Sequence, residues 1–335
     1  MSVNIGVDVG GTKIAACAVD EDGLVVARAK KATPAQDVDA IVSVIVDVVQ
    51  ELRSALTASP ATDSQPADSP RGLDAVGVGV ACAGFVDAAG EKVVFAPNLA
   101  WRDEPLATRV GERIDLPVVL ENDANAAAWG EYRFGAARHA EHMIMVTLGT
   151  GVGGGIIDRD QLLRGAEGMA AEIGHLRVVP DGHRCGCGNR GCWEQYASGS
   201  ALVREARELV AADSTHAADL IERCGGEAQA LTGSMVTQSA LEGEQAAIEL
   251  MEDLGRWVGE GIASLVAVLD TGVIVMGGGV SAAGDLVLEP ARAAFARQLT
   301  ARGHRPVPPI IIAQLGNDAG MIGAADLAAQ RLVFS

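Results

Sequence analysis

Apolar residues alternate with small or polar residues along several short segments of the chain, which is the pattern of β-strands. This pattern predicts strands at residues 3–9, 14–19, 24–29, 74–82, 117–121, 143–148, 156–158, 272–276 and 309–313. Elsewhere apolar residues recur three and four positions apart, the spacing of an amphipathic helix. Helices are therefore predicted at 37–56, 198–211, 214–224, 234–241 and 244–269, with others beginning at Ala126, after Gly279 and near the C-terminal end. The two patterns together predict a chain in which strands and helices alternate.

Three of the predicted strands end in glycine-rich turns, and the first of these turns reads Asp8-Val-Gly-Gly-Thr-Lys13. Glycines leave the backbone bare, so that the N–H groups of Gly10 and Gly11 and the hydroxyl of Thr12 can approach a phosphate closely. Lys13 adds a positive charge, and Asp8 is suited to hold a metal ion through water. The turn is a candidate phosphate site, although an ordinary tight hairpin explains it equally well.

The second turn, at residues 149–155, contains five glycines together with Thr150. A turn of this composition is costly in conformational entropy, which favours a function that needs the backbone exposed. Thr150 and Gly151 are therefore a second candidate phosphate cradle. Because the first two turns share the order strand–Gly–Thr–strand, the chain is expected to contain two related halves with a nucleotide between them.

The third turn, Gly277-Gly278-Gly279, follows a predicted strand and precedes a helix. Its three glycines would let a flat ring or a ribose pack directly on the backbone. A simple turn at the start of a helix is the alternative interpretation.

A cluster of polar residues, Asn122-Asp123-Ala124-Asn125, follows the predicted strand 117–121 directly. In open α/β sheets, the strand ends at which helices begin are the usual place for chemistry. Asn122 or Asp123 can also simply cap the helix that follows. For Asp123 taken alone, the cap is the favoured interpretation.

Cys185, Cys187 and Cys192 fall within eight residues and are interspersed with glycines. Together with one histidine they form the ligand set of a closed, structural zinc site. A disulfide is disfavoured because Cys-x-Cys closes a poor ring and three is an odd number; three buried thiols are the other alternative. The fourth ligand is His175 or His183, and the spacing favours His175.

The flanks of this cysteine cluster carry Glu172, His175 and Glu194. A rigid metal loop would hold these three polar groups in fixed positions. Groups held in this way are suited to hydrogen-bonding a polyol.

Composition narrows the classes of function. The chain of 335 residues is long enough for two domains, and its net charge of -18 disfavours binding to nucleic acid or to acidic membranes. The N-terminus lacks the pattern of a signal peptide, and no apolar run is long enough to span a membrane. Few cysteines, half of them in a metal-like cluster, favour a reducing cytoplasm. Residues 57–72 are rich in Pro, Ser, Ala and Asp and predict a flexible surface loop.

Taken together, the motifs resemble those of the ROK family of sugar kinases and sugar-responsive repressors, and within it those of actinobacterial glucokinases. The resemblance rests on the first turn, on E-N-D-A-N-A-A-A-W-G-E, on L-G-T-G-V-G-G-G-I and on the H-x9-C-x-C-x4-C loop followed by W-E. It implies an α/β, two-lobed, actin-like (RNase H-like) ATPase fold with an interlobe cleft, hinge closure and a structural zinc loop at 175–192. The small lobe would comprise 1–127 with 319–335, and the large lobe 128–318.

The resemblance also implies the substrates and the roles of the candidate residues. It implies ATP-dependent phosphorylation of glucose at its 6-hydroxyl, with Mg²⁺ accompanying ATP, structural Zn²⁺ and a homodimeric or homotetrameric enzyme. Asp123 would be the general base, and His175 rather than His183 would complete the zinc site with Cys185, Cys187 and Cys192. The sugar would be held by Gly84, Asn98, Asn122, Asp123, Glu172, His175 and Glu194. The nucleotide would be held by Asp8, Gly10, Gly11, Thr12, Lys13, Thr150, Gly151, Gly277, Gly278 and Gly279.

Four other functions compete with this one. A repressor of the same family would carry a helix-turn-helix domain, for which there is no room before Asp8. A kinase that uses polyphosphate is disfavoured by the glycines at 277–279, which suit adenosine, and by the absence of a long basic groove in the sequence. A kinase for another hexose or an N-acetylhexosamine is excluded only by the resemblance. A zinc-stabilised binding protein would leave Asp123 and the three glycine turns without a role.

Overall fold

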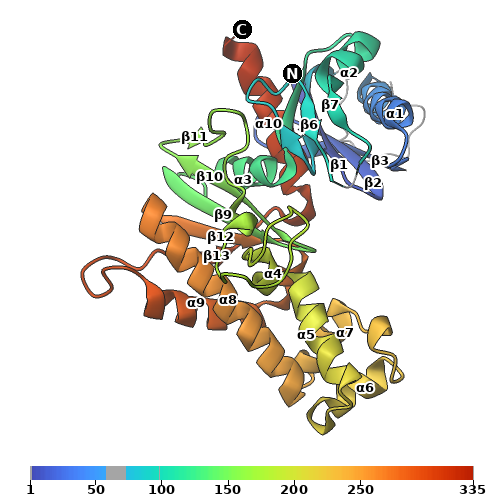
Figure 1. Cartoon of the computed structure of the whole chain (residues 1–335). Coiled ribbons are helices and arrows are strands. Elements are labelled where there is room, and N and C mark those ends of the chain that lie inside the picture. Colours follow the sequence, from blue (N-terminus) through green and yellow to red (C-terminus); the bar gives the residue numbers. More distant parts are fainter. Residues whose placement is uncertain (1, 58–72, 98, 335) are drawn as a thin grey trace, which may run out of the picture. The chain divides into compact units, whose positions relative to one another are not determined.

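The computed structural model describes residues 2–57, 73–97 and 99–334 of the chain. The predicted surface loop, apart from Thr57, and the candidate sugar-binding residue Asn98 lie outside the described residues. The chain divides into two compact units, which are drawn in Figure 1. Unit 1 comprises Met1–Glu141, Gly155–Ala171 and Ala313–Ser335, and unit 2 comprises His142–Gly154 and Glu172–Ile312.

Unit 1 is built on a five-stranded sheet with the strand order β3-β2-β1-β4-β8. The strands are β1 (Ser2–Val9), β2 (Lys13–Val19), β3 (Val25–Ala32), β4 (Asp74–Cys82) and β8 (Val118–Asn122). Strands β1, β2 and β3 pair antiparallel, whereas β4 pairs parallel with both β1 and β8. A small antiparallel sheet of β5 (Phe85–Val86), β6 (Val93–Phe95) and β7 (Arg102–Glu104) follows β4.

Helices cover the sheet of unit 1 because their apolar faces match its buried side chains. Helix α1 (Val38–Thr57) buries Ile41, Val42, Ile45, Val48, Val49 and Leu52, the positions that the helical spacing predicts. These side chains share one core with the apolar residues of β1, β4 and the helix α2 (Leu106–Ile114). The C-terminal helix α10 (Ala319–Phe334), red in Figure 1, packs against β1, β4 and the helix α3 (Asp123–Arg133).

A second five-stranded sheet has the order β11-β10-β9-β12-β13, and most of it belongs to unit 2. Its strands are β9 (His142–Leu148), β10 (Val152–Asp158), β11 (Gln161–Leu162), β12 (Val273–Gly277) and β13 (Ile310–Ile312). In each sheet the five strands, counted along the chain, lie in the order third, second, first, fourth, fifth. This repeated order agrees with the two related halves that the glycine turns predict.

The helices of unit 2 include a long pair, α8 (Gln245–Leu269) and α9 (Asp285–Gln298), which pack against each other (Figure 1). The other helices are α4 (Glu194–Ala197), α5 (Gly199–Ala211), α6 (Ala218–Arg223) and α7 (Gly233–Leu241). Short 3-10 turns lie at Ile173–His175, Thr215–Ala217, Ala228–Ala230 and Gly279–Ala283, and in unit 1 at Gly316–Asp318. No helix of the described part of the chain is long and apolar enough to cross a membrane.

The two units have other bounds than the predicted lobes, whose boundaries lie between residues 127 and 128 and between residues 318 and 319. One difference is that the C-terminal end of helix α3, beyond residue 127, belongs to unit 1. There the buried Glu131 accepts hydrogen bonds from the backbone N–H groups of Ala136, Gln314 and Leu315. Residues 314 and 315 are therefore fastened to α3 before α10 begins.

The predicted glycine turn at 149–155 is shorter in the structure, because residues 152–158 form strand β10. A Cβ atom at Gly154 would clash with the side chain of Ile173, and a Cβ atom at Gly155 would clash with Ala128. These two glycines serve close packing beside the strand, and the exposed turn is reduced to residues 149–151. A prediction that reads every glycine of the run as part of one turn is therefore wrong.

Candidate functional site

In unit 1 the parallel strands β1, β4 and β8 end at the same edge of the sheet. Val9 pairs with Cys82, and Cys82 in turn pairs with Asn122. Asp8 therefore lies beside the strand end that carries Asn122 and Asp123, as expected for the carboxyl edge of an open α/β sheet. The side chain of Asn122 donates from Nδ2 to the backbone oxygen of Gly84 at 3.2 Å, which brings a third predicted sugar-binding position to this edge.

Asn122, and not Asp123, caps helix α3. The backbone of Asn122 is extended, and its Oδ1 accepts hydrogen bonds from the N–H groups of Ala124 at 2.9 Å and Asn125 at 3.1 Å. The expectation that Asp123 is the capping residue is therefore wrong. Asp123 follows as the first helical residue, and its Oδ1 accepts a hydrogen bond from the N–H of Ala124 at 2.9 Å.

Two carboxylates at this edge, those of Asp123 and Asp8, have raised pKa values. The half-buried position of Asp123 raises its pKa, while backbone N–H groups oppose that shift. Burial, and then repulsion from Asp123, raise the pKa of Asp8 to about 6, although Lys13 lowers it. A carboxylate whose pKa lies closer to neutral is a better general base at physiological pH than one at the ordinary value.

The first glycine turn is a hairpin between β1 and β2. Gly10 donates its N–H to the backbone oxygen of Lys13 at 3.0 Å, and the Thr33 hydroxyl donates to the oxygen of Gly10 at 2.7 Å. Gly11, Thr12 and Lys13 are exposed. The turn can therefore be a tight hairpin and a phosphate cradle at once. The backbone groups of Gly10 and Lys13 close the hairpin, while Gly11 and Thr12 between them remain accessible.

In unit 2 the four predicted metal ligands lie together. One ligand atom from each of His175, Cys185, Cys187 and Cys192 lies within 4.8 Å of the other three. The Sγ atoms of Cys187 and Cys192 are 3.6 Å apart, and Nδ1 of His175 is 3.6 Å from Sγ of Cys185. The cluster could hold a metal ion, and the exposed position of Cys187 disfavours the alternative of three buried thiols.

His183, the other candidate ligand, is used elsewhere. Its backbone N–H donates to the hydroxyl of Tyr196 at 2.9 Å, and its ring packs against the Tyr196 ring with centroids 5.3 Å apart. The structure therefore favours His175 as the fourth ligand. The far side of the loop is anchored by the fully buried Trp193, whose Nε1 donates to the backbone oxygen of Trp257 at 2.8 Å.

The three polar residues on the flanks of the metal loop come together around His175. Its Nε2 atom lies 3.8 Å from Oε2 of Glu172, and its Nδ1 atom lies 3.8 Å from Oε1 of Glu194. Because Nδ1 faces the cysteine cluster, Nε2 is left on the side of Glu172. This arrangement offers one ring nitrogen to a metal and the other to a hydroxyl group.

The turn at 149–151 lies close to Glu194 and to the start of helix α5. The N–H of Gly199 donates to the backbone oxygen of Gly149 at 2.8 Å. A Cβ atom at Gly151 would lie only 2.6 Å from Oε2 of Glu194. The candidate phosphate turn is thus fixed to a helix N-terminus, where the helix dipole favours an anion, and touches a candidate sugar-binding side chain.

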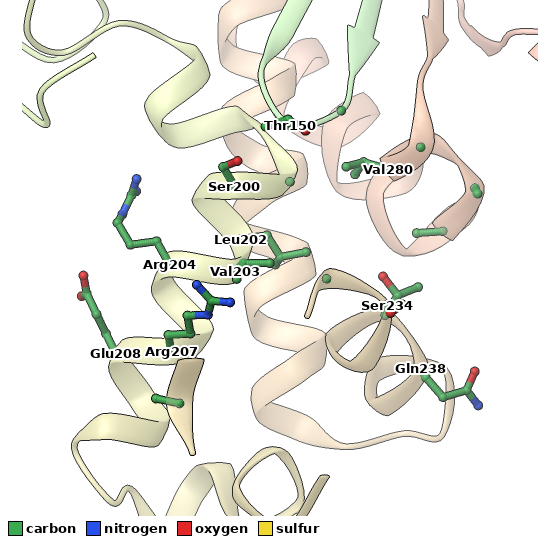
Figure 2. A pocket seen from close by; sticks show the side chains of 18 of the residues that line it. Thr150, Ser200, Leu202, Val203, Arg204, Arg207, Glu208, Ser234, Gln238 and Val280 are labelled. Atoms are coloured by element: carbon green, nitrogen blue, oxygen red, sulfur yellow. The ribbon is translucent and has the colours of Figure 1, made fainter. Parts of the chain in front are cut away.

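Unit 2 contains a cavity of about 1130 Å³ that opens beside this turn. Figure 2 shows side chains from α5 on one side and from α7 and the Val280 turn on the other. Gly149, Thr150 and Gly279 line it, whereas Gly151, Gly277 and Gly278 do not. Helix α5 contributes Arg207 to the wall, where its guanidinium group donates to the backbone oxygens of Gln229 and Leu231.

Most of the surface of this cavity is apolar, but hydroxyl groups such as those of Ser200 and Ser234 and the charged side chains of Arg204, Arg207 and Glu208 also line it (Figure 2). A concave, mostly apolar site with polar groups at its wall is suited to a flat ring with a polar edge. Sequence reasoning found both glycine turns that border the cavity but none of the α5 and α7 residues. Those residues have ordinary helical patterns, and only the tertiary structure brings them to one site.

The chain matches known proteins over nearly its full length. The profile of the ROK family matches residues 4–331. The glucokinase of Streptomyces coelicolor is 46% identical over 98% of each chain, and that of Halalkalibacterium halodurans is 36% identical over 98% of this chain and 95% of the other. A crystal structure of a ROK family glucokinase from Streptomyces griseus in complex with glucose and AMPPNP superposes with a TM-score of 0.83, with 47% identity over 98% of this chain and 99% of that one.

These matches confirm the predicted α/β, two-domain, actin-like fold. The match to the family profile and the identities of the full-length relatives lead to one conclusion. The chain belongs to the ROK family.

Proposed function

We propose that this protein is a glucokinase, which transfers the γ-phosphoryl group of ATP to the 6-hydroxyl of glucose and yields glucose 6-phosphate and ADP. The observation that carries the proposal is the carboxylate of Asp123, which lies at a strand end beside Asn122 and is not the helix cap. Its support is the full-length similarity to glucokinases, including one whose structure holds glucose and AMPPNP.

Asp123 is the general base in this proposal. A sugar hydroxyl is a weak acid and a weak nucleophile, so a carboxylate within hydrogen-bond reach must remove its proton as the bond to phosphorus forms. The cap hydrogen bonds of Asn122 hold the start of α3, and thereby the backbone that carries Asp123. The raised pKa of Asp123 suits this task, since the carboxylate must accept a proton during the reaction and release it afterwards.

The residues proposed to bind the sugar are those that the family resemblance implies, namely Gly84, Asn98, Asn122, Asp123, Glu172, His175 and Glu194. Two features of unit 2 support the proposed roles of Glu172, His175 and Glu194. Both carboxylates lie beside the His175 ring, and its Nε2 atom faces Glu172 while its Nδ1 atom faces Cys185.

The nucleotide is proposed to be bound by the glycine turns and the cavity of unit 2. Gly277, Gly278 and Gly279 would hold adenosine, while Thr150 and Gly151 would contact phosphate at the N-terminus of α5. In unit 1, Gly10, Gly11, Thr12 and Lys13 would hold phosphate with exposed backbone and side-chain donors. Asp8 would hold Mg²⁺ through water, and the ion would neutralise phosphate charge.

The cysteine loop is proposed to hold one structural zinc ion. In a tetrahedral site with Zn–S bonds of about 2.3 Å, two sulfurs lie about 3.8 Å apart and a sulfur lies about 3.6 Å from a histidine nitrogen. The Cys187–Cys192 and His175–Cys185 separations are both 3.6 Å, so the spacing suits zinc. Four protein ligands leave no open position, so the ion would fix the loop between Glu172 and Glu194 and would not activate water.

We further expect a cytoplasmic homodimer or homotetramer, on the basis of the family resemblance. Light scattering coupled to gel filtration tests the assembly, and a monomer at the working concentration of the enzyme would contradict it.

A coupled assay tests the proposed function. The purified chain is offered a panel of glucose, mannose, fructose, N-acetylglucosamine and N-acetylmannosamine, with ATP and polyphosphate as donors. The proposal requires the highest kcat/KM for glucose with ATP. A higher value for another sugar, or for polyphosphate, would overturn the assignment of substrate or donor.

A further inference from the structure

Glu121 is a buried carboxylate directly before Asn122 and Asp123. Its side chain is only 5% exposed. Oε1 accepts hydrogen bonds from the backbone N–H of Asn122 at 3.0 Å and from Nδ2 of Asn125 at 3.1 Å. The carboxylate therefore binds one donor at the end of β8 and one in the first turn of α3.

Its charge is balanced by one arginine from a distant part of the chain. Nε of Arg164 donates to Oε2 of Glu121 at 2.7 Å, and the arginine side chain is 30% exposed. Arg164 belongs to the segment 155–171, which unit 1 also holds through the hydrogen bond of Tyr132 to Asp160 at 2.9 Å. A charge-assisted hydrogen bond thus connects this segment to the strand end.

Three carboxylates share this edge of the sheet. Asp8 pairs with Ala81 and Ala81 pairs with Glu121, while Asp123 follows Asn122 at the end of β8. The nearby cations are Lys13, which acts on Asp8, and Arg164, which binds Glu121. Loss of Arg164 would leave the buried charge of Glu121 close to Asp123 without the guanidinium group that neutralises it.

We propose that Arg164 is a positioning residue for phosphoryl transfer, which holds Asn122 and Asp123 in place through Glu121. Arg164 neutralises Glu121, and Glu121 in turn fixes the N–H of Asn122 and the amide of Asn125 on either side of Asp123. The inference rests on the proposed function, because it requires Asp123 to be the general base.

The substitutions that test the inference separate charge from shape. Arg164→Met is expected to lower kcat by about 10- to 100-fold, because a small displacement of a catalytic group is costly, while KM for ATP stays near the wild-type value. Arg164→Lys keeps the charge and should retain more activity than Arg164→Met. In the double variant Glu121→Gln/Arg164→Met, the amide oxygen of Gln can still accept from Asn122 and Asn125 without a buried charge, so kcat should recover relative to Arg164→Met.

Arg133→Met is the matched control. Nε of Arg133 donates to the carboxylate of Asp326 at 3.0 Å, and the Asp326 side chain is 11% exposed. This pair has the same chemistry as Arg164–Glu121 but lies at the other end of α3. Arg133→Met is expected to lower thermal stability without lowering kcat.

Hydrogen exchange supplies a readout that does not depend on activity. Peptides that cover residues 118–126 should exchange faster in Arg164→Met than in the wild type and in Arg133→Met. An unchanged exchange rate there, a wild-type kcat in Arg164→Met, or equal losses of kcat in both arginine variants would overturn the inference. An inactive wild-type enzyme would overturn the proposed function instead, and the exchange measurement would still decide whether Arg164 holds the strand end.

Discussion

Substitution of Gly151 by alanine is expected to weaken glucose binding as well as ATP binding. From the sequence alone, a side chain at this position should raise KM for ATP far more than KM for the sugar, because Gly151 belongs to the candidate phosphate turn. The structure changes this expectation, since a Cβ atom at Gly151 would lie 2.6 Å from Oε2 of Glu194. Glu194 is one of the proposed sugar-binding residues.

The size of the effect follows from this contact. Ordinary van der Waals contact begins at 3.4 Å, so the carboxylate must retreat by about 0.8 Å. The carboxylate is the end of a flexible side chain, which can move without disturbing the backbone. A hydrogen bond to a charged group contributes about 1.5–3 kcal/mol, so its loss would raise KM for glucose by about 10- to 100-fold.

Steady-state kinetics with glucose and ATP varied in turn measures this effect. Gly149→Ala, on the same turn, is the control for the change in KM for glucose, because a Cβ atom at Gly149 meets nothing within 4 Å. It should leave KM for glucose at the wild-type value, and both variants should keep the wild-type melting temperature. A rise in KM for ATP alone in Gly151→Ala would refute the reasoning, because the contact with Glu194 would then have no consequence for the sugar.

Two further predictions concern the metal loop and the carboxylate edge. Cys187→Ser should contain less zinc in metal analysis and bind glucose more weakly in titration. Glu194→Gln should keep the metal and lose only glucose affinity. Normal glucose binding by a zinc-free Cys187→Ser variant would contradict the first prediction. Because the pKa of Asp8 is raised to about 6, the native state binds more protons than the unfolded state between about pH 4 and 6, and stability falls as the pH rises through that range. Asp8→Asn should therefore raise the free energy of unfolding, measured by denaturant titration, by about 2–3 kcal/mol at pH 7 but not at pH 4. An equal change at both pH values would show that the raised pKa of Asp8 is not the cause.

The local pattern of the chain predicted most of the long strands and helices, because burial of alternating or helically spaced apolar residues decides them. It did not predict helix α2 or the short strands β5, β6, β7 and β11. The choice between neighbouring residues was less predictable. Asn122 and Asp123 are both good caps, and the extended backbone of Asn122, fixed by the end of β8, decides which one caps α3. Likewise, His183 is nearer to the cysteines in sequence, but its loop position beside Tyr196 leaves the metal cluster to His175.

Contacts between distant segments were outside the reach of sequence reasoning. Glu121 was visible as part of a motif, yet its partner Arg164 lies 43 positions away and has no pattern that marks it. The same holds for the α5 and α7 residues that line the cavity of unit 2, because no sequence pattern marks them as neighbours. The glycines at 154 and 155 show the opposite error, because their composition indicates a turn while their neighbours Ile173 and Ala128 require a strand without side chains.

The measurement that tests the central claim most directly is the turnover of Asp123→Asn. The substitution keeps the size and shape of the side chain but removes its basicity, so glucose binding measured by calorimetry should change little. Loss of a general base costs about 10²–10⁴ in rate, and kcat for glucose and ATP should fall by that factor. If the purified variant binds glucose and turns over at a rate near that of the wild type, Asp123 is not the base and the proposed mechanism is wrong.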